Sequence, residues 1–95
     1  MTTRQFELIA KALSDPRRMA LLETISGERA CPCRRLRDQF PVSKATISHH
    51  IKELVRAGLV DARRQGQYLQ CEVRRDVLAA YTAELHRRTG SVGES

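Results

Sequence analysis

Apolar residues recur at intervals of three and four along the first part of the chain, which is the spacing of one buried helix face. The pattern predicts four helices, over residues 4–13, 16–26, 32–39 and 44–57. The side chains expected to face inward are Phe6, Ile9, Ala10, Leu13, Met19, Leu22, Ile25, Leu36, Ile47, Ile51, Leu54 and Val55.

Polar caps, prolines and glycines separate these helices. Ser14 or Asp15 is expected to cap the second helix, because Pro16 suits a first helical turn, where its missing N–H is harmless. Pro41 blocks continuation of the third helix, and Ser43 is expected to cap the fourth. A short helix, a tight turn and a longer helix are the outline of a helix-turn-helix.

The pattern then changes from helical to alternating. It predicts strands over residues 59–64 and 68–73, joined by a turn at Gln65-Gly66-Gln67 in which the glycine can take a positive φ. In the second strand, alternation places Leu69, Cys71 and Val73 on one face.

A last helix, from residue 75 or 76 to about residue 88, completes the predicted fold, with Val77, Leu78, Tyr81 and Leu85 facing inward. The order ααααββα is that of a winged helix-turn-helix, mainly α with a small β-hairpin. A chain of 95 residues has no room for a second core, so one domain is expected over residues 1–89. Residues 90–95 are expected to form a disordered tail.

The charge of the chain favours a nucleic-acid partner. Lys and Arg number 17 against 11 Asp and Glu, a formal net charge of +6. Only two Phe and two Tyr are present, which is a poor supply of stacking platforms for single strands. Double-stranded DNA is therefore the preferred partner.

Two further features bear on where the chain works. No apolar run approaches the roughly 20 residues needed to cross a bilayer, so no membrane association and a cytoplasmic location are expected. In that reducing compartment three cysteines argue against a disulfide framework, and for a metal site, a redox site or buried thiols.

The exposed face of the fourth helix carries the candidate base-reading residues. Helical geometry places small donors and cations near its N-terminal end, the end that a recognition helix offers to the major groove. Ser43 and Lys44 are expected to hold phosphate. The residues expected to line the groove-facing surface are Thr46, Ser48, His49 and Lys52. The alternative is an ordinary solvated helix face.

The hairpin tip is the second candidate DNA contact. Arg64 and Gln67 flank the turn glycine and are expected to lie along a neighbouring groove. The alternative is a solvated hairpin that carries arginine for solubility. His50 lies beside the apolar stripe and is ambiguous between reading bases and holding the helix pair together, so it is left out of the candidate set.

Cys31 and Cys33 bracket a proline at the start of the third helix. Residues two apart diverge by about 200° in mid-helix, but an extended cap residue lets them converge. The helix N-terminus and nearby arginines are expected to lower the thiol pKa, which favours a soft, thiophilic ion. Packing of small residues is the alternative. Cys71 is expected to be a buried small hydrophobe, in preference to a third ligand or redox partner.

The stretches LSDPRRMALLETI, CPC and VSKATISHHIKELVRAGLVDARRQGQYLQCEV resemble, in order, landmarks of the ArsR/SmtB family of bacterial metal-responsive repressors. The resemblance implies a homodimer, built from the first and last helices, on operator DNA with an inverted repeat. It also implies release when an inducer binds, with no cofactor required. Members with Cys-x-Cys here resemble sensors of arsenite, antimonite, cadmium or lead.

The family pattern is incomplete, because Leu36 stands where some members carry a third cysteine. A zinc site on the last helix is not expected, since Asp76 lacks its companion histidine. Two alternatives remain open: a thiol redox sensor on the same fold, or a regulator without a metal response. An enzyme is not expected, because the cysteines have no nearby base.

Overall fold

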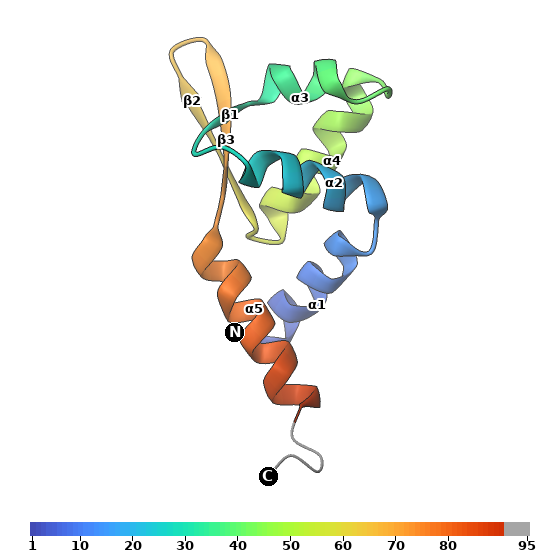
Figure 1. The fold of residues 1–95 in the computed structure, drawn as a ribbon, viewed down its shortest axis with the longest axis vertical. Coiled ribbons are helices and arrows are strands. Elements are labelled where there is room, and N and C mark those ends of the chain that lie inside the picture. The colour runs from blue at the N-terminus through green and yellow to red at the C-terminus, as the bar shows by residue number, and fades with distance from the viewer. Residues whose placement is uncertain (91–95) are drawn as a thin grey trace.

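The computed structural model describes residues 1–90 as five helices and three strands (Figure 1). The helices are α1 (Thr3–Leu13), α2 (Pro16–Ser26), α3 (Cys33–Gln39), α4 (Lys44–Arg56) and α5 (Arg75–Thr89). The strands are β1 (Cys31–Pro32), β2 (Val60–Gln65) and β3 (Tyr68–Val73). The predicted winged helix-turn-helix is confirmed, while the last five residues of the expected tail lie outside the described part.

The sheet has one strand more than predicted. Its order is β1-β3-β2, so the short strand β1 pairs with the outer side of the predicted hairpin. Cys31 lies opposite Cys71, and Pro32 lies opposite Gln70. A strand of two residues is too short to leave an alternating pattern, which is why the sequence did not reveal it.

The helices begin and end near the capping residues, prolines and glycines that the sequence indicated. Asp15, rather than Ser14, caps α2, and its carboxylate accepts hydrogen bonds from the backbone N–H groups of Arg17 and Arg18. Gly58 follows α4 with φ +86° and Gly66 occupies the hairpin turn with φ +64°. Both glycines therefore take the left-handed conformation that their positions require.

The core lies where α2, α3 and α4 meet the sheet, with α1 packed against α2 and α4. Its fully buried side chains are Ile9, Leu21, Ile25, Leu36, Ile47, Leu54, Leu59, Val60, Cys31, Cys33 and Cys71. Four residues predicted to face inward do not: Ala10, Met19, Val55 and Leu85 are exposed. In α2 the buried stripe runs through Leu21, Leu22 and Ile25, because the sheet and α4 contact that side of the helix.

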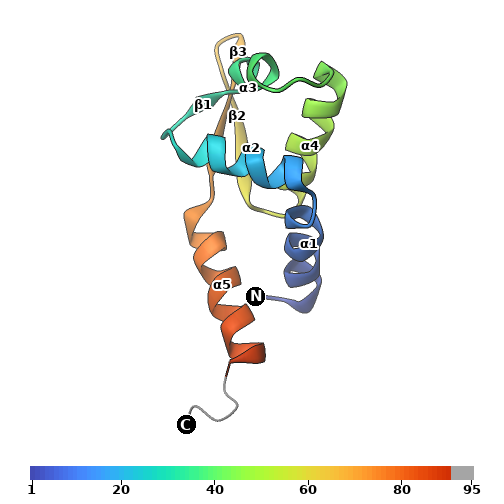
Figure 2. The ribbon, with the colours of Figure 1, turned by 45° about the vertical axis from the view of Figure 1, so that its right-hand side comes forward.

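The first and last helices lie side by side below the sheet and helices α2 to α4 (Figures 1 and 2). The rings of Phe6 and Tyr81 are 5.2 Å apart, and the Arg88 guanidinium stacks on Phe6. No residue of α5 is buried, and Leu85 is 42% exposed. Ile9, by contrast, is fully buried in its own chain, as predicted for an inward-facing residue of the first helix.

None of the described helices is long and apolar enough to cross a bilayer.

Candidate DNA-binding surface and cysteine junction

The start of α4 is fixed by its cap. The Ser43 hydroxyl accepts a hydrogen bond from the backbone N–H of Thr46 at 3.1 Å, and the two hydroxyls are 2.9 Å apart. These contacts satisfy a donor that the helix leaves free at its first turn. Ser43 and Thr46 therefore have a structural task in this structure, in addition to the DNA contacts predicted for them.

The remaining candidates on α4 face solvent. Lys44, Ser48, His49 and Lys52 are exposed, whereas Ile47, Ile51 and Leu54 are buried on the opposite side. This division results from the helical period, which separates the two sets of positions. The helix thus presents a continuous polar surface that begins at its N-terminus.

A basic cleft lies between α3, the start of α4 and the hairpin. Its volume is about 530 Å³, and its lining residues are Pro32, Arg34, Arg37, Asp38, Lys44, Arg64, Gln67, Tyr68 and Leu69. The cleft brings together three residues that were predicted from separate segments, namely Lys44, Arg64 and Gln67. Four cations against one carboxylate make it suitable for a phosphate backbone.

Two arginines of this basic cleft were not predicted. Arg34 and Arg37 belong to α3, and the Arg34 guanidinium stacks on the Tyr68 ring of the hairpin at 5.2 Å. In the sequence Arg34 appeared only as a neighbour of the cysteines, and Arg37 was not singled out. Their spacing of three residues on one helix could have indicated a common cationic face.

A second groove lies on the other side of Arg37, between α4 and the hairpin. Its volume is about 380 Å³ and it is mostly apolar. The residues that line it are Cys33, Arg37, Ser48, Ile51, Lys52, Val55, Arg56, Ala62 and Leu69. We call it the Cys33 groove. It joins a cysteine of α3 to two predicted DNA contacts, Ser48 and Lys52.

His50, which the sequence left ambiguous, connects α4 to α2. Its Nδ1 lies 3.3 Å from a guanidinium nitrogen of Arg18, which also donates from Nε to the Ala12 carbonyl. Burial lowers the pKa of His50, an effect partly opposed by the nearby Asp15 carboxylate and strengthened by Arg18. A neutral imidazole is therefore the form that fits this junction.

The three cysteines meet where β1 ends and α3 begins. Cys33 forms a disulfide with Cys71, across a Cα–Cα distance of 6.2 Å. Cys31 is a free, buried thiol. Cys71 is buried, as predicted, but the preference against a redox partner is wrong in this state. The expected pair of free thiols at Cys31 and Cys33 is likewise absent, because Cys33 is bonded to Cys71.

The thiol of Cys31 also differs from the prediction in its acidity. Burial raises its pKa, and the Glu28 carboxylate acts in the same direction, while Arg35 opposes them. Arg35 forms an ion pair with Glu28 at 2.6 Å, and the Glu28 charge offsets the effect of Arg35 on the pKa of the Cys31 thiol. Within residues 1–90, His, Cys, Asp and Glu side chains form no group of three or more able to hold a metal ion in this state.

Comparison with known proteins places this geometry in a family. A helix-turn-helix domain family matches residues 13–63. The arsenical resistance operon repressor of Staphylococcus xylosus is 39% identical over 66 residues, 70% of this chain and 62% of that protein. The transcriptional repressor SdpR of Bacillus subtilis is 31% identical over 70 residues, 74% of this chain and 77% of that protein. The chain belongs to the ArsR family of regulators.

Solved structures agree with this ArsR-family fold. An ArsR-like transcriptional regulator from Rhodococcus sp. RHA1 superposes with a TM-score of 0.80 at 24% identity, over 88% of this chain and 78% of that one. A homodimeric winged helix-turn-helix DNA-binding domain from Mycobacterium bovis gives 0.74 at 20% identity, over 97% and 85% of the two chains. The match to the Staphylococcus xylosus protein spans less than two thirds of that repressor. The prediction of an ArsR-family regulator is confirmed.

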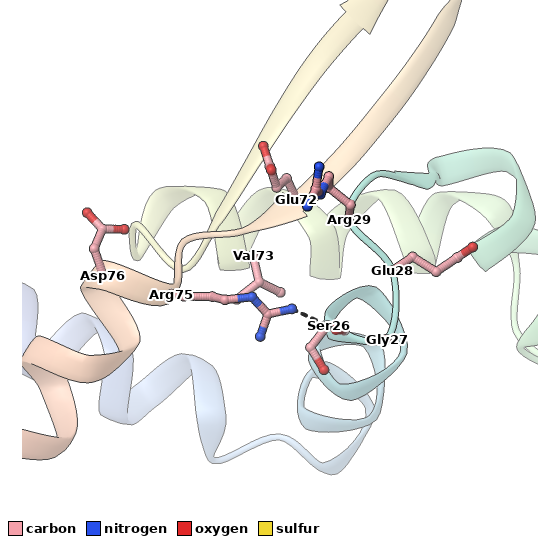
Figure 3. Close-up of a pocket in the computed structure, with 8 residues that line it drawn as sticks. All are labelled: Ser26, Gly27, Glu28, Arg29, Glu72, Val73, Arg75 and Asp76. Carbon is pink, nitrogen blue, oxygen red and sulfur yellow. Dashed lines mark hydrogen bonds between the residues drawn. The ribbon is translucent and has the colours of Figure 1, made fainter.

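In this ArsR-family chain a further cavity, of about 510 Å³, shares no lining residue with the basic cleft (Figure 3). Its lining residues are Ser26, Gly27, Glu28, Arg29, Glu72, Val73, Arg75 and Asp76. The guanidinium of Arg75 points across it and donates a 2.8 Å hydrogen bond to the Ser26 carbonyl (Figure 3). This bond connects the start of α5 to the end of α2. The polar groups of this cavity therefore have a structural role, which is to hold the two helices together.

Proposed function

We propose that this chain is a dimeric, cytoplasmic repressor that binds operator DNA and is released when arsenite or antimonite binds at Cys31 and Cys33. Cadmium and lead are the second choice of inducer. DNA binding would use Ser43, Lys44, Thr46, Ser48, His49 and Lys52 of the α4 region, with Arg64 and Gln67 of the hairpin.

The observation that carries the DNA-binding part is the basic cleft. Lys44 from α4 and Arg64 from β2 line the same cleft as Arg34 and Arg37 from α3. Cations from three elements on one surface suit a phosphate backbone better than scattered surface charges do. The polar face of α4 lies beside this cleft, where base edges would be read.

The inducer part is supported by the position of the cysteines and by the relatives. Cys33 is the first residue of α3 and lines the groove that Ser48 and Lys52 also line. An ion bound there would shift α3 against α4, and a coupling of about 1–3 kcal/mol is enough for a useful switch. The Staphylococcus xylosus relative is named as an arsenical resistance operon repressor.

The dimer is supported by the surface of α5. Val77, Leu78 and Tyr81 are only half-buried, and Leu85 is exposed. An apolar helix face that one chain leaves uncovered is suited to a second copy of the chain. Two-fold symmetry would then require an inverted repeat in the operator, with half-sites about one helical turn apart.

A mobility-shift titration with and without arsenite tests the whole proposal. Cys31→Ser/Cys33→Ser should bind operator DNA with nearly wild-type affinity, because the base-reading residues lie on α4. It should no longer release DNA when arsenite is added to the reduced protein. If this double variant still responds to arsenite, the sensor lies elsewhere and the inducer part of the proposal is wrong.

The disulfide favours a second candidate function, a thiol redox sensor. Disulfides in reducing compartments are usually transient or sensory, and Cys33–Cys71 connects α3 to the hairpin. Under this alternative, peroxide alone would change DNA affinity and arsenite would not. Measuring both reagents in the same titration separates the two functions.

A further inference from the structure

The three cysteines project to one face of the sheet, although they come from two distant segments. Cys31 and Cys71 are opposite each other in the antiparallel ladder of β1 and β3, and opposite residues point to the same face. Cys33 follows Cys31 across Pro32, whose φ of −63° and ψ of 128° are extended. Side chains two positions apart in extended backbone also share a face.

We propose that Cys71 of β3 is the third sulfur ligand, so that Cys31, Cys33 and Cys71 together hold one arsenite- or antimonite-derived ion. This inference rests on the proposed function, because it supplies the ligand missing from the same site. Trivalent arsenic forms three bonds and keeps a lone pair, so three thiols on one face satisfy it. In the reaction, one arsenous acid and three thiols give three As–S bonds and three waters, with no electron transfer.

The disulfide supports this ligand set. A bond between Cys33 and Cys71 places their two sulfurs within reach of a single ion once that bond is reduced. The Cα atoms need not separate for this, since 6.2 Å is an ordinary spacing for neighbouring cysteines. Leu36, by contrast, is apolar and fully buried in the core, so α3 itself offers no third ligand at that position.

Burial makes the junction selective for a thiophilic ion. Cys31 and Cys71 are 0% exposed and Cys33 is 2% exposed, which leaves little room for a water molecule as third ligand. The Cys33 groove, of about 380 Å³, gives access to the junction from the surface. Soft thiolates in an apolar setting favour a soft ion over a hard one.

Oxidation and ion binding exclude each other at this site. A peroxide converts the thiols of Cys33 and Cys71 into the disulfide and two waters, with two electrons passing to the peroxide. This removes two of the three ligands and leaves Cys31 as the free thiol. The oxidised repressor would therefore not bind arsenite. A thiol reductant reverses the reaction and regenerates the site.

X-ray absorption on the reduced full-length protein with one equivalent of arsenite tests the ligand count directly. The expected result is three sulfur neighbours around arsenic. Two sulfurs and one oxygen would overturn the inference, and this measurement needs no variant to fold.

A matched pair of variants tests the identity of the ligand. Cys71→Ala should weaken arsenite binding by about tenfold or more, given that even an indirect partner of a metal site contributes 10–100-fold. Gln70→Ala, the neighbour on the opposite face of β3, is the control and should bind arsenite as the wild type does. Equal affinities in all three proteins would refute the assignment of Cys71. Circular dichroism melts establish that both variants are folded.

The outcomes separate this inference from the proposed function. If arsenite releases DNA from wild type and from Cys71→Ala at the same concentration, the repressor proposal stands and the third ligand is wrong. If reduced wild type binds no arsenite at all, both are wrong. After peroxide treatment, mass spectrometry should find one alkylatable thiol per denatured chain, and arsenite binding should be lost. Undiminished binding to that oxidised protein would also overturn the inference.

Discussion

A guanidinium nitrogen of Arg18 in α2 lies 3.3 Å from Nδ1 of His50 in α4. The same arginine donates to the Ala12 carbonyl at the end of α1, so one side chain connects three helices. The Arg18 guanidinium can only donate, so this contact requires a neutral imidazole whose Nδ1 accepts the hydrogen bond. A protonated ring would instead place a second positive charge beside the guanidinium. The stability of the DNA-binding body should therefore depend on pH.

The pH prediction follows from the direction of the shift. The pKa of His50 is lower in the folded chain than its ordinary value of 6.5, mainly through burial, with Arg18, His49 and Arg17 acting in the same direction and Asp15 against them. The unfolded chain therefore binds the proton first. The stabilisation is fully present above about pH 6.5 and is lost as the pH falls through the folded pKa.

His50→Gln removes this titration and should flatten the fall in the free energy of unfolding below pH 6.5. Urea titrations between pH 8 and pH 5 measure it. His86→Gln, a histidine of α5 away from this junction, is the control and should keep the wild-type pH dependence. A wild-type profile in His50→Gln would show that another group is responsible.

Base discrimination should depend on the exposed face of α4. Ser48→Ala and His49→Ala should each reduce the preference for operator over random DNA by about 1–3 kcal/mol. Binding to random DNA should change little, because these side chains are proposed to contact base edges and not phosphates. Competition titrations with both duplexes measure the ratio. The assignment is contradicted if His49→Ala leaves that ratio untouched while Arg64→Ala alters it.

Affinity for any duplex should depend on the basic cleft. Arg64→Ala and Arg37→Ala should weaken binding to operator and random DNA alike and reduce the slope of log K against log salt by about one unit each. Arg87→Ala is a matched control, since this exposed arginine pairs with Glu84 on α5, away from the cleft. An equal change in slope for Arg87→Ala would mean that the cleft is not the contact surface.

Dimerisation should depend on one side of α5. Leu85→Glu introduces a charge beside Tyr81 and should weaken the dimer by at least tenfold, or about 1.4 kcal/mol. Ala83→Glu adds the same charge about 200° away around the helix and should leave the dimer intact. Sedimentation equilibrium at micromolar concentration distinguishes them. A wild-type monomer under those conditions would refute the dimer itself.

Much of the fold was predictable from residues that act locally. Asp15, Pro16 and Ser43 cap or begin helices, and Gly58 and Gly66 take the positive φ of a helix end and a hairpin turn. These signals depend on a few neighbouring atoms, so the sequence carries them directly. The exposure of the candidate recognition residues followed for the same reason, because a helical period separates Ser48 and Lys52 from the buried stripe.

The features that were missed depend on contacts between distant segments. The pairing of Cys31 with Cys71 requires the short strand β1, which has no periodicity of its own. The partner of Cys33 is 38 residues away, and no spacing rule indicates it. Arg34 and Arg37 become part of the basic cleft only because the hairpin folds back over α3. Met19 and Val55 were misplaced because neighbouring elements, and not the helix alone, decide which side is covered.

Strand β3 is the central strand of the sheet, and a single residue, Arg74, separates its end from α5. The Arg74 N–H donates to the Leu59 carbonyl, and its side chain forms ion pairs with Asp61 and Asp76. The connection between the strand and the helix therefore has little conformational freedom. A displacement of Cys71 would therefore move both ends of β3, namely the hairpin tip at one end and α5, the proposed dimerisation helix, at the other. In a symmetric dimer, the two units formed by β3 and α5 would determine the distance between the two hairpins. That distance decides whether both hairpins can contact the same stretch of DNA duplex.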